Sequence, residues 1–134
     1  MTFIKFYLVA FGIFFLIDML WLGVIAKNLY RAEIGHLMAS EFRLMPAFLF
    51  YLIYIVGLVF FAILPSFREE SLKLAIAYGA LFGFVSYATY DLTNLATLKG
   101  WPVKIVIYDL LWGTFISGIT PFISLLIGLH WKKF

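Results

Sequence analysis

The chain has 134 residues, of which 65% are hydrophobic and only 13% are charged. Soluble globular proteins are about half apolar and about a quarter charged, so this composition excludes an ordinary soluble domain. The net charge of +3 comes from scattered basic residues with no basic run, so we expect membrane lipids as partners and no nucleic acid. The absence of cysteine excludes disulfides and thiolate metal sites.

Four apolar stretches are long enough to cross a membrane, since a helix needs about 20 apolar residues to span about 30 Å of hydrocarbon. We expect spans over residues 3–26, 44–64, 72–98 and 102–129. The alternating segments typical of a membrane β-barrel are absent. Asp18 interrupts the first stretch and no small-x-small site follows it, which favours an uncleaved span over a signal peptide. The predicted fold class is an all-α, four-helix transmembrane bundle, with residues 1–134 forming a single transmembrane domain.

The polar connections predict where the spans begin and end. Pro65 is expected to end the second span, and a short charged turn to Glu70 follows it. Gly100 suits the end of the third span and Pro102 the first turn of the fourth. The longest connection, from Lys27 to Arg43, can carry a short interfacial helix.

An even number of spans places both termini on one side of the membrane. The positive-inside rule scarcely selects that side, because the basic residues divide equally. The terminal side would hold Lys5, Arg68, Lys73, Lys132 and Lys133, and the other side Lys27, Arg31, Arg43, Lys99 and Lys104. The basic pair at 132–133 favours cytoplasmic termini, and insertion in both orientations remains an alternative.

Three aspartates fall inside the expected spans, where each charge costs about 2.5–3.5 kcal/mol on insertion. Asp18 lies about 12 Å from the end of its span and Asp109 about 10 Å from the start of its own, at about 1.5 Å per residue. Asp91 lies near the end of the third span. Because neighbouring spans alternate in direction, all three carboxyls are expected in the same half of the membrane. The acids can also be explained without a functional site: Asp91 would then be solvated at the membrane interface, and Asp109 would be favoured by the dipole of its helix.

Aromatic and polar residues accompany these acids. Trp residues stand three positions after Asp18 and after Asp109, and Asn94 three after Asp91, so each pair shares a helix face. Nearby carboxylates in a low dielectric resist ionising together, so one can carry a proton, and Trp rings can stack on a cation. The predicted ligand or proton pocket comprises Asp18, Trp21, Tyr90, Asp91, Asn94, Asp109 and Trp112, with Arg31, His36 and Lys99 as further contributors from the loops.

No cofactor and no metal site is predicted. The chain lacks a glycine-rich phosphate loop and a Gly-x-Ser-x-Gly elbow. His36 and His130 are expected on opposite sides of the membrane, so they cannot share a metal ion. Three aspartates alone would under-fill the coordination shell of a hard cation.

A row of small residues in the third span, at Ala75, Gly79 and Gly83, recurs at every fourth position. Such rows let two helix backbones approach closely in lipid. We expect this row to pack inside the bundle, and a homodimer seam is the alternative.

Several short motifs run through the chain: Asp-x-x-Trp-Leu-Gly at 18–23, Pro-Ala-x-x-Phe-Tyr at 46–51, Thr-Tyr-Asp-Leu-Thr-Asn at 89–94, Trp-Pro at 101–102 and Asp-x-x-Trp-Gly at 109–113. In these motifs, and over essentially its whole length, the chain resembles a family of small four-span bacterial inner-membrane proteins that is grouped only as a domain of unknown function. The resemblance implies a multi-pass protein of the bacterial inner membrane. It implies no activity.

Three functions stay open on these grounds. The favoured one is binding or transport of a small ligand, cation or proton through the acidic and aromatic pocket. The first alternative is a membrane enzyme acting on a lipid or quinone-like substrate, with Asp and Tyr as acid and base, although no nucleophile or cofactor motif supports it. The second alternative is a structural or accessory membrane subunit in which the polar cluster joins the helices.

Overall fold

The computed structural model describes residues 1–41 and 43–131, and these contain helices and no strand. Two of the four long helices have π-helical segments, named η1 and η3. The elements in chain order are α1 (Thr2–Leu20), η1 (Trp21–Ile25), α2 (Lys27–Ile34), the 3₁₀ turn η2 (Gly35–Leu37), α3 (Leu44–Leu58), η3 (Val59–Ile63), α4 (Leu64–Arg68), α5 (Leu72–Thr97) and α6 (Val103–His130). Because η1 continues α1, and η3 and α4 continue α3, the chain has four helices long and apolar enough to cross a membrane. The all-α membrane bundle is confirmed.

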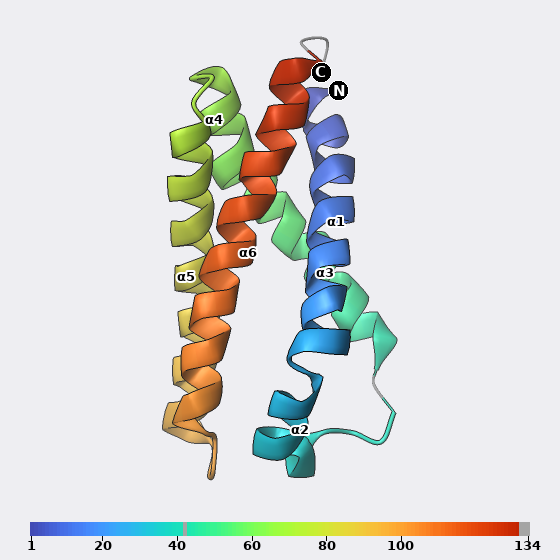
Figure 1. Cartoon of the computed structure of the whole chain (residues 1–134), viewed down its shortest axis with the longest axis vertical. Coiled ribbons are helices and arrows are strands. Elements are labelled where there is room, and N and C mark those ends of the chain that lie inside the picture. The colour runs from blue at the N-terminus through green and yellow to red at the C-terminus, as the bar shows by residue number, and fades with distance from the viewer. Residues whose placement is uncertain (42, 132–134) are drawn as a thin grey trace.

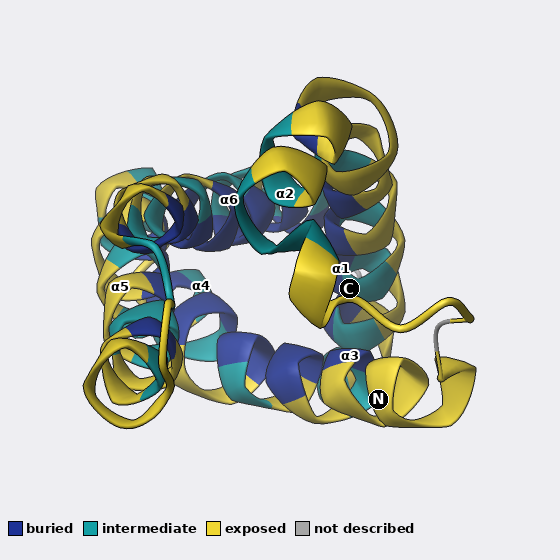
Figure 2. Ribbon diagram, turned by 90° about the horizontal axis from the view of Figure 1, so that it is seen from below, coloured by how far each residue is buried: buried dark blue, intermediate teal, exposed yellow. Residues whose placement is uncertain are grey.

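The four helices stand around a common axis, and both ends of the described chain lie at the same end of the bundle (Figure 1). Helices α5 and α6 run side by side along their length, and α1 lies on the other flank of α6. The remaining long helix, which runs from α3 through η3 to α4, crosses the bundle obliquely behind α1. Each of the four long helices is one wall of the bundle. The short helix α2 lies at the end of the bundle away from the termini, next to η1 and α6. Seen from that end, buried residues line the inner faces and exposed residues the outer ones (Figure 2).

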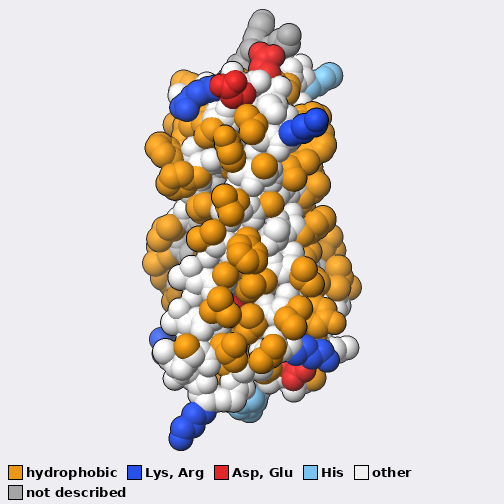
Figure 3. All heavy atoms as spheres, turned by 90° about the vertical axis from the view of Figure 1, so that its left-hand side faces the viewer, with side chains coloured by type: hydrophobic (Ala, Val, Ile, Leu, Met, Phe, Trp, Pro, Cys, Tyr) orange, Lys and Arg blue, Asp and Glu red, His pale blue; other side chains and the backbone are white. Residues whose placement is uncertain are grey.

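The outer surface of the bundle is apolar. Leu8, Leu16, Phe60, Leu81 and Phe115 are each more than half exposed, at 65%, 66%, 59%, 62% and 55%. Figure 3 shows hydrophobic side chains over the middle of one face, with most charged side chains near the two ends. Soluble monomers rarely expose an apolar patch larger than a few hundred Å². This distribution, together with the four long apolar helices, is that of a multi-pass membrane protein.

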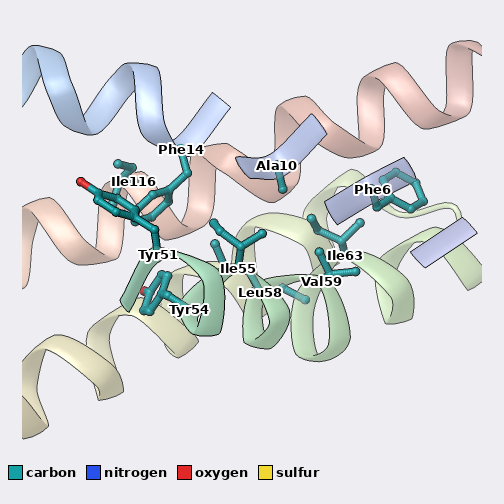
Figure 4. Packing of buried hydrophobic residues seen from close by; sticks show 11 residues of the cluster. Phe6, Ala10, Phe14, Tyr51, Tyr54, Ile55, Leu58, Val59, Ile63 and Ile116 are labelled. Atoms are coloured by element: carbon teal, nitrogen blue, oxygen red, sulfur yellow. The ribbon is translucent and has the colours of Figure 1, made fainter. Parts of the chain in front are cut away.

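The core is largely aromatic and joins three of the walls. Phe6, Ala10 and Phe14 of α1 point toward the oblique α3–η3 wall (Figure 4). The ring of Phe14 meets Tyr51 edge to face, with centroids 5.9 Å apart, and Phe6 meets Phe67 in the same way at 5.0 Å. Edge-to-face pairs of this kind add about 0.5–1.5 kcal/mol beyond the area that they bury. The core therefore stabilises the crossing of α1 and α3 through ring geometry as well as burial.

The contact between α5 and α6 depends on glycine. A Cβ atom on Gly79 would overlap the backbone carbonyl of Ser117, and one on Gly83 would overlap the carbonyl of Gly113. Pro121 lies inside α6 and has no N–H to donate to the carbonyl one turn earlier, that of Ser117. Ala75, the third member of the small-residue row, is also fully buried. The small-residue row therefore packs inside the chain, and α5 approaches α6 where α6 itself is irregular.

The second long helix does not end at Pro65, contrary to the expectation from sequence. The helix continues to Arg68, and the turn that follows contains Glu69 and Glu70. Pro65 stands in the first turn of α4, directly after the π-helical segment η3, where the hydrogen-bond register changes and a missing N–H is tolerated. The short helix expected in the first connection is present as α2. Lys132 and Lys133, which favoured cytoplasmic termini, lie outside the described residues.

Candidate functional site

A cavity of about 500 Å³ lies in the half of the bundle where α2 lies. Every wall contributes to it, and aromatic side chains make up much of the lining. The lining residues are Asp18, Trp21, Leu22, Tyr30, Ile34, Phe50, Tyr54, Ser86, Tyr87, Tyr90, Trp101, Asp109 and Trp112. The volume is within the range of about 300–1,000 Å³ that is usual for small-molecule sites.

Asp18 connects three helices at one side of this cavity. The side chain is 5% exposed, and its Oδ1 accepts a hydrogen bond of 3.0 Å from the Trp112 indole Nε1–H. Its Oδ2 accepts a hydrogen bond from the Tyr51 hydroxyl. Each carboxylate oxygen of Asp18 therefore has a donor, one on α6 and one on α3. Charge-assisted bonds of this type are the strong ones, so Asp18 helps to hold the bundle together as well as lining the cavity.

A second chain of hydrogen bonds attaches α2 to the bundle. The Trp21 indole Nε1–H donates to the Tyr30 hydroxyl over 3.2 Å, and that hydroxyl donates to Oδ1 of Asp109. Burial raises the pKa of Tyr30 above its ordinary value, and the neighbouring Asp109 carboxyl raises it further. Tyr30 is therefore a neutral donor at physiological pH. Through this hydrogen bond, α2 contacts the Asp109 carboxyl from the end of the bundle that lies at the membrane surface.

Two stacked indole rings line the cavity, one hydrogen-bonded to Asp18 and the other to Tyr30. Trp21 and Trp112 stack with ring centroids 4.5 Å apart and planes 8° from parallel. Trp21 opens the π-helical segment η1, in which the Ala26 N–H donates to the Trp21 carbonyl, five residues back, over 2.7 Å. π-Helical turns are rare and often occur at functional sites. Here the segment ends the first span and carries Trp21 and Leu22, both of which line the cavity.

Asp91 differs from the other two aspartates in its complete burial and its lack of a hydrogen-bond donor among the described residues. It is 0% exposed, and neither of its carboxylate oxygens has a hydrogen-bond partner in the described structure. The Asp109 carboxyl and the Trp101 indole lie close to it, and a proton shared between the two carboxyls would join Asp91 to Asp109. The indole N–H of Trp101 is buried and unpartnered as well. A buried polar group without a partner is costly, and such groups in native structures point to a ligand, a proton or an ordered water.

The three aspartates have no basic partner among the described residues. No Lys or Arg in residues 1–41 or 43–131 forms an ion pair with Asp18, Asp91 or Asp109. At the surface end, Lys104 of α6 forms an ion pair with Glu33 of α2 at 3.6 Å. Within the same ranges, no group of three acidic or histidine side chains has the arrangement of a metal site. The site can thus bind a proton or accept a positively charged ligand, whose charge the protein does not itself supply.

The structure brings together most of the pocket residues expected from sequence. Asp18, Trp21, Tyr90, Asp109 and Trp112 line the cavity. Asp91 lies beside Asp109 and is fully buried, which excludes the interpretation of a solvated acid at the interface.

Five of the expected residues do not line the cavity: Asp91, Asn94, Arg31, His36 and Lys99. Asn94 is half-buried, and the three loop residues are exposed. Sequence reasoning missed Tyr30, Tyr54 and Trp101 as cavity residues and Tyr51 as the partner of Asp18. Tyr51 and Trp101 stand in the Pro-Ala-x-x-Phe-Tyr and Trp-Pro motifs, which mark them without assigning a role, whereas Tyr30 lies among charged residues of the first connection and has no such signal.

The comparisons with known proteins give one family. Residues 3–126 match the family model described as "Predicted membrane protein (DUF2177)". No curated protein and no solved structure matches the chain. The matched range includes all three aspartates and every residue that lines the cavity. The chain therefore belongs to this family of predicted membrane proteins, DUF2177.

Proposed function

We propose that this protein binds a small organic cation in the cavity between its helices, with the aspartates as counter-charges. The observation that carries the proposal is the set of three buried carboxyls for which no described basic residue supplies a partner. Ionisable groups inside a membrane are expensive and usually mark a ligand, ion or proton site. A bound cation would supply the missing charge.

The lining supports an organic cation better than a bare metal ion. The stacked pair Trp21 and Trp112 presents an aromatic surface next to Asp18 and Asp109. Aromatic faces attract ammonium and pyridinium groups by about 0.5–2 kcal/mol, more when water is excluded. The cavity of about 500 Å³ is also far larger than a single metal ion requires.

The proposal places the protein in a bacterial inner membrane with both termini in the cytoplasm. The cavity end, with α2, would then face the opposite compartment. The basic residues near the C-terminus support this orientation, through the positive-inside rule.

Methylpyridinium is a suitable probe, because pyridinium rings quench indole fluorescence on contact. Titrated into the protein in nanodiscs at pH 8, it should quench part of the Trp emission in a saturable manner. Asp109→Asn keeps an oxygen to accept the Tyr30 hydrogen bond and removes only the charge, so it should weaken binding about tenfold, equal to about 1.4 kcal/mol.

Two controls isolate the effect of charge. Glu69→Gln neutralises an exposed acid at the other end of the bundle and should leave the binding curve unchanged. Pyridine, which is neutral at pH 8, has the same ring without the charge and should bind more weakly than methylpyridinium. The proposal fails if methylpyridinium shows no saturable quenching, or if Asp109→Asn binds it as tightly as the unchanged protein.

A structural role for the cluster is the second candidate, and the two bonds to Asp18 favour it. Tyr51 and Trp112 already occupy both oxygens of that carboxylate, so Asp18 can serve as a connector between helices without any ligand. Asp109 favours binding, because it lines the cavity and no described basic residue pairs with it. The methylpyridinium titration separates these candidates.

A further inference from the structure

Helices α3 and α5 are in contact over only part of their length, and they separate toward the cavity end because α3 is oblique. The two walls meet where the Phe82 ring of α5 lies against Gly57 and packs on Phe61, with ring centroids 5.9 Å apart in the second pair. Toward the cavity end, α3 runs to the far side of the bundle, whereas α5 continues straight beside α6 (Figures 1 and 2). Tyr54 is the last α3 residue whose ring reaches Phe82, at 5.1 Å.

The cavity occupies the space below this point of divergence, since Tyr54, Ser86, Tyr87 and Tyr90 all line it. Three of the lining residues are themselves exposed. They are Leu22, Phe50 and Tyr90, at 44%, 44% and 57%, and we call these three the mouth. They come from η1, α3 and α5, so the cavity reaches the outer surface among these elements.

Two of the mouth residues lie well inside their helices, and Leu22 lies three residues from the end of η1. At about 1.5 Å per residue, Phe50 is about 9 Å inside the start of α3 and Tyr90 about 10 Å inside the end of α5. The neighbouring outer surface is apolar, with Ile53 70% and Val85 53% exposed. A molecule that passed the mouth would therefore move into acyl chains and not into water.

The charge pattern restricts what can use this route. A positive group would find the carboxyls at the inner end of the cavity, whereas a phosphate would find no described basic side chain among the lining residues. Phosphatidylethanolamine and other zwitterionic phospholipids carry that phosphate beside their cationic group, so the cavity disfavours them. The complementary ligand has a positive head and no anion.

We infer that the cavity accepts a cationic amphiphile whose charged head lies near Asp109 and whose aliphatic tail passes through the mouth into the lipid. This inference rests on the proposed function and adds the ligand class and the route of entry. The tail then remains in hydrocarbon in both the free and the bound state. Affinity expressed per mole fraction of ligand in the bilayer should consequently not depend on tail length.

The test compares methylpyridinium with hexadecylpyridinium in phosphatidylcholine nanodiscs, with ligand partition measured on empty discs. Hexadecylpyridinium should quench saturably, compete with methylpyridinium, and lose about tenfold in affinity in Asp109→Asn. Replacing a third of the lipid by phosphatidylethanolamine should leave its binding unchanged. A gain of competition from phosphatidylethanolamine would contradict the charge argument and point to a lipid headgroup as the occupant.

Substitutions in the cavity lining, at and beside the mouth, test the route. Ser86→Trp adds bulk to the α5 side of the cavity, and it should weaken hexadecylpyridinium about tenfold while changing methylpyridinium less than about twofold. Phe50→Trp adds bulk to the mouth from the α3 side and should have the same effect. Val85→Trp makes the same change one residue away, on the exposed outer face of α5, and should affect neither ligand.

The outcomes separate the two proposals. If methylpyridinium binds in an Asp109-dependent manner but hexadecylpyridinium does not compete with it, the cavity is closed to tails and only this inference is wrong. The same conclusion follows if both ligands bind and neither Ser86→Trp nor Phe50→Trp distinguishes them. If neither ligand binds saturably, the proposed function itself fails.

Discussion

Trp112 and Asp18, on α6 and α1, are joined by a hydrogen bond of 3.0 Å from the indole Nε1 to carboxylate Oδ1, while Tyr51 of α3 occupies the other oxygen. A carboxylate can accept from both donors at once. An amide offers only one oxygen, and its NH₂ group would face one of these donors. Asp18 thus differs from Asp109, which accepts a single side-chain hydrogen bond in the described structure, from Tyr30.

Asp18→Asn should therefore destabilise the bundle, by about 1–3 kcal/mol, the cost of one buried donor left unpaired. Asp109→Asn should cost less, because its remaining oxygen still accepts from Tyr30 and one of two neighbouring carboxyls becomes neutral. Thermal unfolding of the two variants in the same detergent measures the difference. Equal unfolding temperatures, or a larger loss for Asp109→Asn, would contradict the assignment of Asp18 as the helix connector.

The glycines of α5 give a prediction about packing. Gly79→Ala places a Cβ against the backbone carbonyl of Ser117, which cannot rotate away, so we expect a loss of about 1–3 kcal/mol from overpacking. Gly12→Ala is the matched control, because a Cβ there meets nothing within 4 Å. Thermal unfolding should show a lower transition for Gly79→Ala alone. A Gly79→Ala protein as stable as the Gly12→Ala protein would show that α5 and α6 are not packed this closely.

The helices and the depth of the acids could be predicted from the sequence, because both depend on length and on the order of the spans. Four apolar runs interrupted by charged turns leave little choice of fold class. The common half of the membrane for Asp18, Asp91 and Asp109 follows from the alternating direction of the spans, and the cavity lies there.

The lateral arrangement could not be predicted, since helices that are apolar all round carry no signal of which face turns inward. Tyr51 and Tyr54 face the core, and nothing in the surrounding Phe, Leu and Ile residues distinguishes that face. The segment η1 also shifts the helical register at Trp21, and such a shift is not encoded in hydrophobic spacing.

Asn94 shows how a correct local rule fails. Residues three apart do share a helix face, which placed Asn94 with Asp91 in the predicted pocket. The buried face of α5 instead follows a spacing of four, through Ala75, Gly79 and Gly83 and on to Asp91. Asn94 is out of step with this row, so it is only half-buried and does not line the cavity.

The orientation can be tested with single cysteines, because the chain has none of its own. Ser40→Cys lies beyond α2 at the cavity end, and Glu69→Cys lies in the turn at the terminal end, both exposed. With cytoplasmic termini, a membrane-impermeant maleimide added to intact cells should label Ser40→Cys and not Glu69→Cys. Labelling of Glu69→Cys alone would reverse the orientation, and labelling of both would support insertion in two orientations.

Tyr30 predicts a dependence of stability on pH. Its pKa is raised by burial and by the Asp109 carboxyl, so the folded protein keeps the phenol proton after the unfolded chain has lost it. The unfolded phenol ionises near pH 10. The stability that the Tyr30 hydroxyl contributes is therefore fully present below about pH 10 and decreases as the pH rises above that value.

Tyr30→Phe removes this contribution together with the hydrogen bonds from Trp21 and to Asp109. A hydrogen bond to a charged group contributes about 1.5–3 kcal/mol, so the variant should unfold at a lower temperature than the unchanged protein at pH 8. The gap between the two unfolding temperatures should narrow by pH 11, since only the unchanged protein loses stability through this phenol. Tyr108→Phe, on the exposed face of α6 beside Asp109, controls for the removal of one hydroxyl. A gap of the same size at pH 8 and pH 11 would mean that Tyr30 is not held protonated against Asp109, and that α2 is attached to the bundle by other contacts.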